Sequence, residues 1–397
     1  MKKLIALLIA IVMVLSLAAC GANGDKGGDD KAPIKIGSIQ DLTGGASSSG
    51  QPQAWGVEYA VKWINENGGI NGRQIELHTR DCQNDAEVGV TAYRELVDEV
   101  GVCAIIGPAL SNPASAWVEL ATEDKIPIVG HFMDEVCTTN PETGEVYPYM
   151  FLAEPSCSYQ SYIVGEYAME ELGVQSVATL YNPSNAFAAA HEAPLVDYIE
   201  AHGGSVVARE TFGWTDGDYT AQAQKIADLN PDAVFLCDYL AQVTTAYDNL
   251  RDAGYEGIIL GANTLAASFP DLVKNEIYDV YLVQNYELDK GKIGEITDAH
   301  MAETGTNFRS TNAGFGWDAM MVLYNAMKQA NDPTNGEEVR DILENKTTAV
   351  ELCGIDTITI NPETHRPTVE MGMYMAAYDA NRVLYIIGHY TTEYTGK

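Results

Sequence analysis

Residues 34–72 of the chain read IKIGSIQDLTGGASSSGQPQAWGVEYAVKWINENGGING. The stretch opens on an apolar run at Ile34–Ile39 that is typical of a buried strand. Apolar residues then recur every three or four positions, which predicts a helix with one apolar stripe, and Gly68-Gly69 predicts its end. The stripe consists of Ala54, Val57, Val61 and Ile64. A strand followed by a helix with one apolar face is the repeating unit of an α/β fold.

The same alternation continues along the chain, which favours parallel sheets with helices on both faces. Further strands are predicted at Gln74–Thr79, Ala104–Gly107, Pro127–Gly130, Met150–Leu152, Ser176–Tyr181, Ser205–Thr211, Ala233–Leu236, Gly257–Leu260 and Val280–Val283. Helices are predicted near Ser158–Leu172, Ala186–His202, Tyr219–Leu229 (with Asp218 as its N-cap), Ala241–Ala253, Gly294–Glu303, Gly316–Ala330 and Gly336–Glu344. A final hairpin is predicted from Met373–Tyr378 and Val383–Gly388. Because the pattern occurs twice, the predicted fold is α/β with two doubly wound parallel-sheet lobes.

The N-terminus has the features of an export signal. The apolar run Leu4–Leu15 follows two lysines and is shorter than the roughly 20 residues of a membrane-spanning helix. Leu17-Ala18-Ala19-Cys20 resembles a lipobox, so we expect residues 1–19 to be removed and Cys20 to carry a diacylglyceryl group, whose two chains give stable attachment. Residues 20–33 contain almost no apolar side chains and are expected to form a flexible tether on the extracytoplasmic face of the cell membrane.

The formal net charge of −33 excludes nucleic acid as a partner, because such binding requires a basic surface. Six cysteines remain besides the predicted lipid site, and no two of them form a CxxC pair, so the sequence indicates no zinc or thioredoxin-like site. Cys103 and Cys237 lie in apolar runs and are predicted to be buried thiols. Cys137 and Cys157 are candidates for a disulfide, which an exported chain permits.

The sequence lacks the common signatures of enzymes, such as GxxxxGK[ST], HExxH and GxSxG. Residues 314–319 match GxGxxA in form, but no predicted strand precedes them. Ser47-Ser48-Ser49 is expected to be a polar loop. His131 lies near Asp134 without a nucleophile or metal pattern, so a place in a pocket wall is its expected role. The sequence therefore predicts a binding protein without a cofactor.

In open α/β sheets, ligands bind beyond the carboxyl ends of the strands. A cleft between two lobes would bring the strand ends of both sheets together, and Phe132, Phe187, Tyr239 and Phe315 are candidates to line it, although aromatic residues in such loops also pack into cores. The strand ends are Gln40–Ser49, Pro108–Ser111, His131–Asp134, Asn182–Phe187, Asp238-Tyr239 and Ala262–Thr264.

Three polar residues at these strand ends each have two interpretations. Ser111 precedes Pro113 at a predicted helix start and is a predicted N-cap, whose hydroxyl either serves its own helix alone or also holds a ligand anion. Asp134 and Asp238 either cap their own loops or clamp a cationic group from opposite lobes.

The quoted stretch also carries a family resemblance. Ile34-Lys35-Ile36-Gly37, Leu42-Thr43-Gly44 and Gly68-Gly69-Ile70-Asn71-Gly72 look like the N-terminus of the leucine/isoleucine/valine-binding family of type I periplasmic binding proteins. Asp218–Gln222 and Asn230–Val234 are similar to later parts of the same family, and the resemblance extends over nearly the whole chain after the tether.

This resemblance implies a monomeric receptor that closes on its ligand like a Venus flytrap and delivers it to the permease and ATPase subunits of an ABC importer. Its two lobes would be joined by three crossovers, near Ala153, Gln284 and Asn361. The N-terminal lobe would comprise residues 34–152 and 285–361, and the C-terminal lobe residues 153–284 and 362–397.

The resemblance also assigns roles to single residues. Ser111 matches the serine that receives an amino-acid carboxylate, and Tyr239 matches a pocket tyrosine. Other positions depart from the family: His131–Asp134 replaces a loop of small residues and threonine, Asn263 stands where an acidic residue often binds the α-amino group, and Ser49 stands where an aromatic is common.

We therefore expect a small polar solute, an amino acid or a similar compound, whose ammonium group is met by Asp134 or Asp238. An amide, a polyamine or an aromatic acid is the alternative ligand, and a sensor that acts through a membrane partner is the alternative function. The predicted ligand-binding residues are Ser49, Leu110, Ser111, His131, Phe132, Asp134, Phe187, Asp238, Tyr239 and Asn263.

Overall fold

The computed structural model describes residues 32–394 except 267, 289, 307–309, 346, 355–356 and 369–370. The predicted signal segment, the lipid site Cys20 and most of the tether lie outside the described residues. Two sheets dominate the fold, and a smaller sheet of three short strands accompanies them. None of the helices in the described part of the chain is long and apolar enough to cross a membrane.

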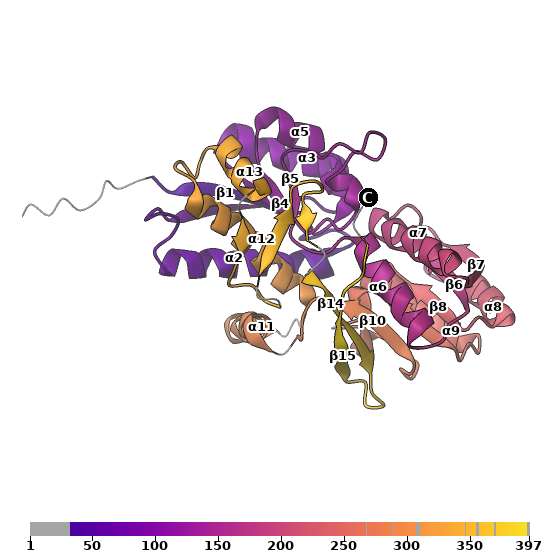
Figure 1. Ribbon diagram of the computed structural model, residues 1–397. Coiled ribbons are helices and arrows are strands. Elements are labelled where there is room, and N and C mark those ends of the chain that lie inside the picture. The colour runs from indigo at the N-terminus through magenta and orange to yellow at the C-terminus, as the bar shows by residue number, and fades with distance from the viewer. Residues whose placement is uncertain are drawn as a thin grey trace, which may run out of the picture. The chain divides into compact units, whose positions relative to one another are not determined.

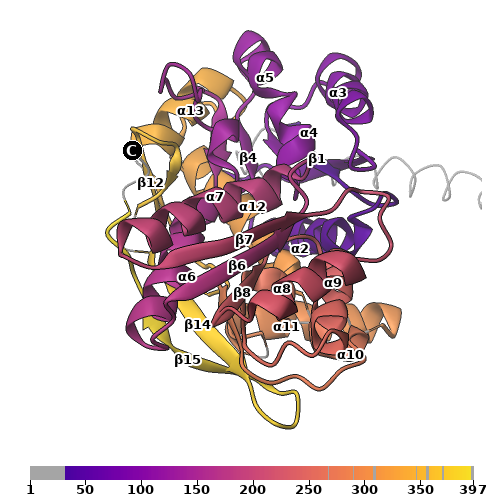
Figure 2. The same ribbon diagram turned by 90° about the vertical axis from the view of Figure 1, so that its right-hand side faces the viewer.

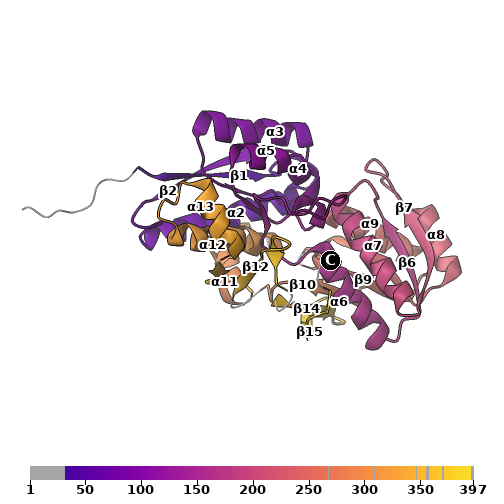
Figure 3. The ribbon, with the colours of Figure 1, turned by 45° about the horizontal axis from the view of Figure 1, so that its top comes forward.

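The first sheet is wholly parallel, with the strand order β2-β1-β3-β4-β5. Helices α2 and α12 pack on one face, and α3, its continuation η1 and α5 pack on the other (Figures 1 and 3). The strands are β1 (Ile34–Gln40), β2 (Ile75–Asp81), β3 (Ile105–Ile106), β4 (Ile128–Gly130) and β5 (Met150–Leu152). The helices are α2 (Ser47–Glu66), α3 (Ala86–Arg94), η1 (Glu95–Val100), α5 (Val118–Asp124) and α12 (Thr311–Gln329).

Successive residues of a strand point to opposite sides of the sheet. Both faces of this sheet are apolar because the residues on each side are apolar. Ile106 and Val129 pack in the core that contains most of the predicted stripe of α2, whereas their neighbours Ile105 and Ile128 pack against α3 and α5. All four residues are fully buried. A parallel sheet buried on both faces therefore explains why these short strands read as continuous apolar runs.

Helices α2 and α12 cross in very close contact through two glycines. A Cβ atom at Gly56 would lie 1.9 Å from the carbonyl oxygen of Ala313, and one at Gly316 would lie 2.1 Å from the carbonyl oxygen of Gln53. The glycines of residues 314–319 thus serve helix packing inside α12, and this segment forms no nucleotide-binding turn.

The second sheet has the order β15-β14-β10-β9-β8-β6-β7, in which the first two strands are antiparallel to their neighbours. Helices α6 and α7 cover one face, and α8 and α9 cover the other. The strands are β6 (Ser176–Tyr181), β7 (Ser205–Thr211), β8 (Ala233–Leu236), β9 (Ile258–Gly261), β10 (Val280–Gln284), β14 (Met373–Tyr378) and β15 (Leu384–Tyr390). The helices are α6 (Cys157–Glu170), α7 (Ala186–Ala201), α8 (Thr220–Leu229) and α9 (Leu240–Asp252).

The predicted terminal hairpin is present as β14 and β15, at one edge of the second sheet (Figure 2). The fold class predicted from the sequence is therefore correct: two α/β lobes, each built on a sheet that is parallel or largely parallel. The remaining elements are α4 (Ser111–Ser115), η2 (Glu135–Cys137), η3 (Asn263–Leu265), α10 (Phe269–Leu272), α11 (Gly291–Thr304), α13 (Gly336–Asn345), β11 (Thr348–Ala349), β12 (Ile358–Asn361) and β13 (Arg366–Pro367).

The chain passes between the two sheets three times. It leaves the first lobe after Leu152, returns after Gln284 and leaves again beyond Pro367. Strand β13 still lies beside β5 of the first sheet, where the N–H of Leu152 donates to the carbonyl of His365. The third crossing is therefore several residues later than the predicted position near Asn361. Residues 362–367 accompany the first sheet, not the second.

Two carboxyl groups are buried where the first two crossings meet. The hydroxyl of Tyr286, just after β10, lies 2.9 Å from a carboxyl oxygen of Glu154, just after β5, and 2.8 Å from one of Asp318 in α12. Since a phenol has one proton to donate, both contacts are hydrogen bonds only when one carboxyl group is protonated. Burial raises the pKa of both acids, that of Asp318 to about 7. This shared-proton pair links segments that are distant in the sequence.

Several local predictions were wrong. Ser47-Ser48-Ser49 is the first turn of α2 and not a loop. Asp218 lies one position before the N-cap of α8, although its carboxylate still accepts the N–H of Thr220 at 2.7 Å. Of the cysteine predictions, that for Cys237 is confirmed, since it is buried, and that for Cys103 is wrong, since it is only partly buried. Cys137 and Cys157 are both free thiols, so they form no disulfide.

Candidate functional site

A cavity of about 390 Å³, including space that opens to solvent, lies where the strand-end loops of the two sheets meet. The first sheet contributes the loops after β3 and β4, the second contributes those after β6, β8 and β9, and the first turns of α2 and α12 complete the wall. The lining residues are Ser49, Ala109, Leu110, Ser111, His131, Met133, Phe187, Tyr239, Asn263, Thr264 and Asn312. The rule that ligands bind at carboxyl strand ends thus selected the segments that meet here.

Apolar contacts join the two lobes beside the cavity. Ala109 and Leu110 of the first lobe form a small buried cluster with Tyr239 of the second. Phe187 packs against that cluster, and its ring stacks with the ring of Tyr239 at a centroid distance of 6.1 Å. Leu110, Phe187 and Tyr239 were all predicted as site residues, and the structure brings them together.

A second contact between the lobes is polar and lies at the rim. The side-chain oxygen of Asn112 accepts the N–H of Ala186 at 3.1 Å, and its side-chain nitrogen donates to the carbonyl of Ser184 at 3.4 Å. One asparagine in α4 thereby bonds to the loop that precedes α7.

His131 forms an uncharged part of the wall. Its ring is 4% exposed and stacks on Phe315 of α12 with centroids 3.4 Å apart. Burial lowers the pKa of His131 well below its ordinary value, so the imidazole is neutral at physiological pH. Phe315 therefore supports the cavity from behind, which corrects its predicted place in the lining.

Three buried polar atoms of the lining have no hydrogen-bond partner among the described residues: Nδ1 of His131, the hydroxyl of Tyr239 and the hydroxyl of Thr264. Burial raises the pKa of Tyr239, so its hydroxyl stays protonated. Buried polar groups are almost always hydrogen-bonded, and an exception needs an explanation. Three such atoms around one cavity are readily explained by a solute that bonds to them.

Ser111 lines the cavity but is not the N-cap that the sequence predicted. Leu110 holds that position, and Ser111 is the first residue of the five-residue helix α4. The hydroxyl of Ser111 accepts the N–H of Asp134 at 3.2 Å, which fastens the loop after β4 to the loop after β3. The hydroxyl keeps its own proton for donation to a further acceptor.

The two predicted aspartates do not line the cavity. Asp238 accepts the N–H of Asn182 at 3.2 Å, the side-chain amide of Asn185 at 2.8 Å and its neighbour's N–H at 2.7 Å. Asp134 accepts the N–H of Val136 at 3.1 Å as the N-cap of η2. Burial raises the pKa of each to about 6. Asp134 thus has the capping role that the sequence left open, whereas Asp238 holds mainly the neighbouring loop after β6.

Phe132 is also outside the lining, since it is fully buried in the core of the first lobe. The structure thus brings together Ser49, Leu110, Ser111, His131, Phe187, Tyr239 and Asn263 from the predicted set. It adds Ala109, Met133 and Thr264, which lie in the predicted strand-end loops but not in the predicted set of site residues. It also adds Asn312, which sequence reasoning missed because the helix was predicted to begin at Gly316. The available signal was Ser310, whose hydroxyl accepts the N–H of Asn312 as a helix cap.

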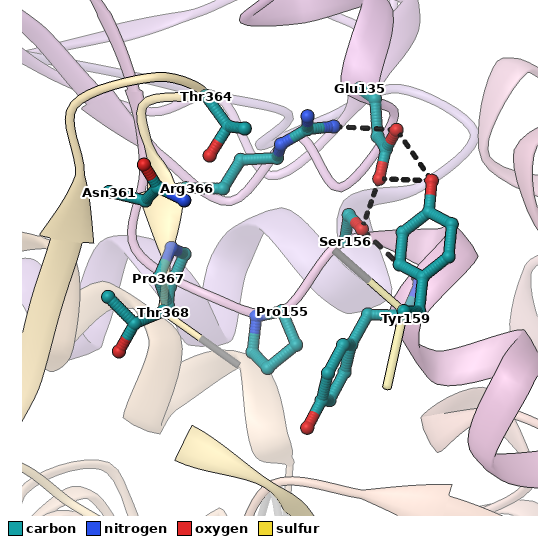
Figure 4. A pocket seen from close by; sticks show the side chains of 10 residues that line it. Glu135, Pro155, Ser156, Tyr159, Asn361, Thr364, Arg366, Pro367 and Thr368 are labelled. Atoms are coloured by element: carbon teal, nitrogen blue, oxygen red, sulfur yellow. Dashed lines mark hydrogen bonds and ion pairs between the residues drawn. The ribbon is translucent and has the colours of Figure 1, made fainter. Parts of the chain in front are cut away.

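A second cavity, of about 380 Å³ including space that opens to solvent, lies beside the first and third crossings (Figure 4). It is organised around Glu135, which follows the loop that carries His131 and Met133. The carboxylate of Glu135 pairs with Arg366 at 2.6 Å and accepts the hydroxyl of Ser156 at 2.6 Å (Figure 4). It also accepts the hydroxyl of Tyr394 at 3.0 Å. One carboxylate therefore holds the segments of the first and third crossings and the C-terminal Tyr394 next to the wall of the first cavity.

No group of His, Cys, Asp and Glu side chains suited to a metal ion occurs within the described ranges. The neutral lining of the first cavity and its unpaired polar atoms suit the recognition of an organic solute. They do not form an acid and base pair with a nucleophile.

Comparisons with known sequences agree with this description. The family model named periplasmic binding protein matches residues 33–382. The Leu/Ile/Val-binding protein homolog 3 of Brucella melitensis is 25% identical over 240 residues, which are 59% of this chain and 62% of that protein. The chemotactic signal transduction system substrate-binding protein BasB of Halobacterium salinarum is 26% identical over 242 residues, 59% of this chain and 57% of that protein. The matches thus span about three fifths of these relatives.

Solved structures share the fold. The branched-chain amino acid transporter substrate-binding protein LivJ of Streptococcus pneumoniae, in complex with isoleucine, has a TM-score of 0.76 and 22% identity and covers 91% of this chain and 99% of its own. A solute-binding protein of Rhodopseudomonas palustris in complex with benzoate has a TM-score of 0.78 and 18% identity, with coverages of 92% and 99%. Because the family model spans most of the chain and the fold agrees, this chain belongs to the Leu/Ile/Val-binding family of periplasmic binding proteins, a family of substrate-binding proteins and not of enzymes.

Proposed function

We propose that this chain is the extracytoplasmic receptor of an ABC importer and captures a small organic solute between its two lobes. The observation that carries the proposal is the cavity built from strand ends of both sheets, whose lining contains three buried polar atoms without a partner among the described residues. Movement of the lobes about the three crossings would admit the solute and then enclose it.

The receptor is proposed to be held at the membrane by a lipid on Cys20. The Leu17-Ala18-Ala19-Cys20 boundary and the polar stretch after it support this part of the proposal. Replacement of Cys20 by Ala is expected to release the chain from the membrane fraction. Retention of the variant in membranes would contradict a lipid anchor.

The ligand expected from the sequence is an amino acid or a similar compound, and the isoleucine bound to LivJ is in keeping with it. The proposed role of Asp134 and Asp238 as ammonium partners has no support from their positions, because neither lines the cavity. The benzoate bound to the Rhodopseudomonas neighbour indicates that this fold also accepts a solute without an ammonium group.

A sensor is the second candidate, and the similarity to a chemotactic signal transduction protein favours it. The two functions differ in the partner that the liganded receptor engages. The deciding experiment starts from a thermal-shift screen of the purified chain against amino acids, amides, polyamines and aromatic acids, since a ligand stabilises the folded state by mass action.

The solute with the largest shift is then tested with the permease and ATPase of the same genome in proteoliposomes. Stimulation of ATP hydrolysis and solute uptake by the liganded chain supports the importer. A solute that binds but leaves hydrolysis and uptake unchanged refutes the importer and leaves the sensor.

A further inference from the structure

The polar groups that the cavity offers to a solute are all neutral. Tyr239 presents a protonated hydroxyl, Thr264 presents a hydroxyl, and His131 presents a neutral imidazole. The side chains of Tyr239 and His131 are 7% and 4% exposed, so their polar atoms are shielded from water. Ser111, Asn263 and Asn312 add further neutral groups to the lining.

Carboxylates in the loops that border the cavity already accept hydrogen bonds from nearby backbone and side-chain groups. Asp41 accepts the N–H of Gly44 at 2.6 Å and that of Ala46 at 2.7 Å. Asp238 accepts three hydrogen bonds, and Asp134 caps η2. A reorientation of Asp41 or Asp238 toward a solute would leave several buried N–H groups unpaired, which opposes it.

The rest of the wall is apolar and partly aromatic. Ala109, Leu110 and Met133 line one side, and Phe187 lies on the other beside Tyr239. An ammonium group enclosed here would lose its hydration while it met only neutral dipoles. A buried ammonium without a carboxylate partner is costly. A carboxylate or carboxamide end, in contrast, can accept the protons of the Tyr239 and Thr264 hydroxyls, which have no partner among the described residues.

We infer that the ligand binds through a carboxylate or carboxamide end and lacks an ammonium group. The inference rests on the proposed solute-binding function and narrows its substrate class. The planar end accepts from Tyr239 and Thr264, while the apolar body contacts Phe187 and Leu110. An ordinary α-amino acid is thereby disfavoured, even though relatives of this chain are named for such ligands.

The test uses two matched series of probes, one with the leucine body and one with the phenylalanine body. Each series comprises the amino acid, the corresponding deamino acid, its amide, and the amine left after decarboxylation. Calorimetry on the purified chain is expected to show the deamino acid or the amide binding at least about tenfold tighter than the amino acid and the amine of the same body. The acid and amide arms show which planar end is preferred.

A single substitution should reverse the preference. Asn263→Asp places a carboxylate in the wall with almost no change of shape, so affinity for the amine and the amino acid should rise at least about tenfold. Asn230→Asp is the matched control, because Asn230 is exposed at the end of α8. This substitution adds the same charge outside the cavity. That control should bind the probes as the parent does.

Tighter binding of the amino acid or the amine by the parent overturns the inference, but it leaves the receptor function intact. Absence of binding by every probe, to parent and to Asn263→Asp alike, also overturns it, since both bodies suit an apolar wall. Failure of the importer proposal can be told apart from failure of this inference. The importer is tested by ATP hydrolysis and solute uptake, whereas the inference is tested by the order of probe affinities.

Discussion

The shared-proton pair of Glu154 and Asp318 makes stability depend on pH in a way that one substitution should remove. Asp318→Asn replaces the acid with an amide of the same shape. The amide oxygen can still accept the N–H of Cys353, a bond of 2.8 Å in the parent, and the amide nitrogen can donate to the hydroxyl of Tyr286. That hydroxyl is then free to donate to Glu154, which also accepts the side chain of Asn285 at 2.6 Å.

The magnitude follows from the pKa of Asp318, which burial raises to about 7 in the folded chain. The unfolded value is about 3.9. Because the folded value is the higher one, protonation of Asp318 stabilises the fold fully below about pH 4, and this contribution is lost as the pH rises toward about 7. A difference of about three pKa units corresponds to roughly 4 kcal/mol at most, since each unit is worth about 1.4 kcal/mol.

Urea unfolding of parent and variant at several pH values between about 5 and 8 measures the effect. The free energy of unfolding of the parent is expected to fall relative to that of Asp318→Asn by about 2–3 kcal/mol across this range, because part of the total is already lost below about pH 5. Asp298→Asn is the control, since Asp298 is exposed on α11. A difference between parent and Asp318→Asn that stays constant with pH would refute the shared proton.

Three further predictions concern the cavity and the helix crossing. Tyr239→Phe removes a hydroxyl without another partner and should weaken solute binding by about 1 kcal/mol, roughly fivefold by calorimetry, whereas the exposed Tyr385→Phe should not. Asn112→Ala deletes both hydrogen bonds across the rim and should speed solute release severalfold in stopped-flow measurements, with the melting temperature of the unliganded chain almost unchanged. Gly316→Ala pushes a methyl group into the backbone of α2 and should cost about 1–3 kcal/mol in urea unfolding, whereas Gly45→Ala, with open space around it, should be neutral.

The fold could be predicted well from the sequence because its strands are short apolar runs and its helices carry single apolar stripes. The strands Ser176–Tyr181, Ser205–Thr211 and Ala233–Leu236 begin and end where the sequence placed them. The start of α12 was missed, since Thr311, Ala313, Gly314 and Phe315 are all buried and only Asn312 is partly exposed, so this turn shows no stripe. Periodicity cannot mark a helix end that has no exposed face.

The candidate site could be predicted only at the level of loops. The strand-end rule selected the segments that meet, but it could not tell which side chains face the cavity. Asp238 and Phe132 illustrate the limit, because the first is bound by three nearby donors and the second turns into the core. These outcomes depend on side-chain packing and on backbone groups contributed by other segments. The lipid site at Cys20 lies outside the described residues and stays a prediction.

The free thiols have a practical consequence. The six described cysteines are unpaired, and five of them are buried. Burial raises the pKa of Cys82 and of Cys103 to about 12, so few of these groups are thiolate at neutral pH. A cysteine introduced at the cavity rim, for example at Asn312, would then react with a maleimide dye ahead of the native ones. The chain is thus suited to conversion into a fluorescent reporter of its own ligand without removal of its natural cysteines.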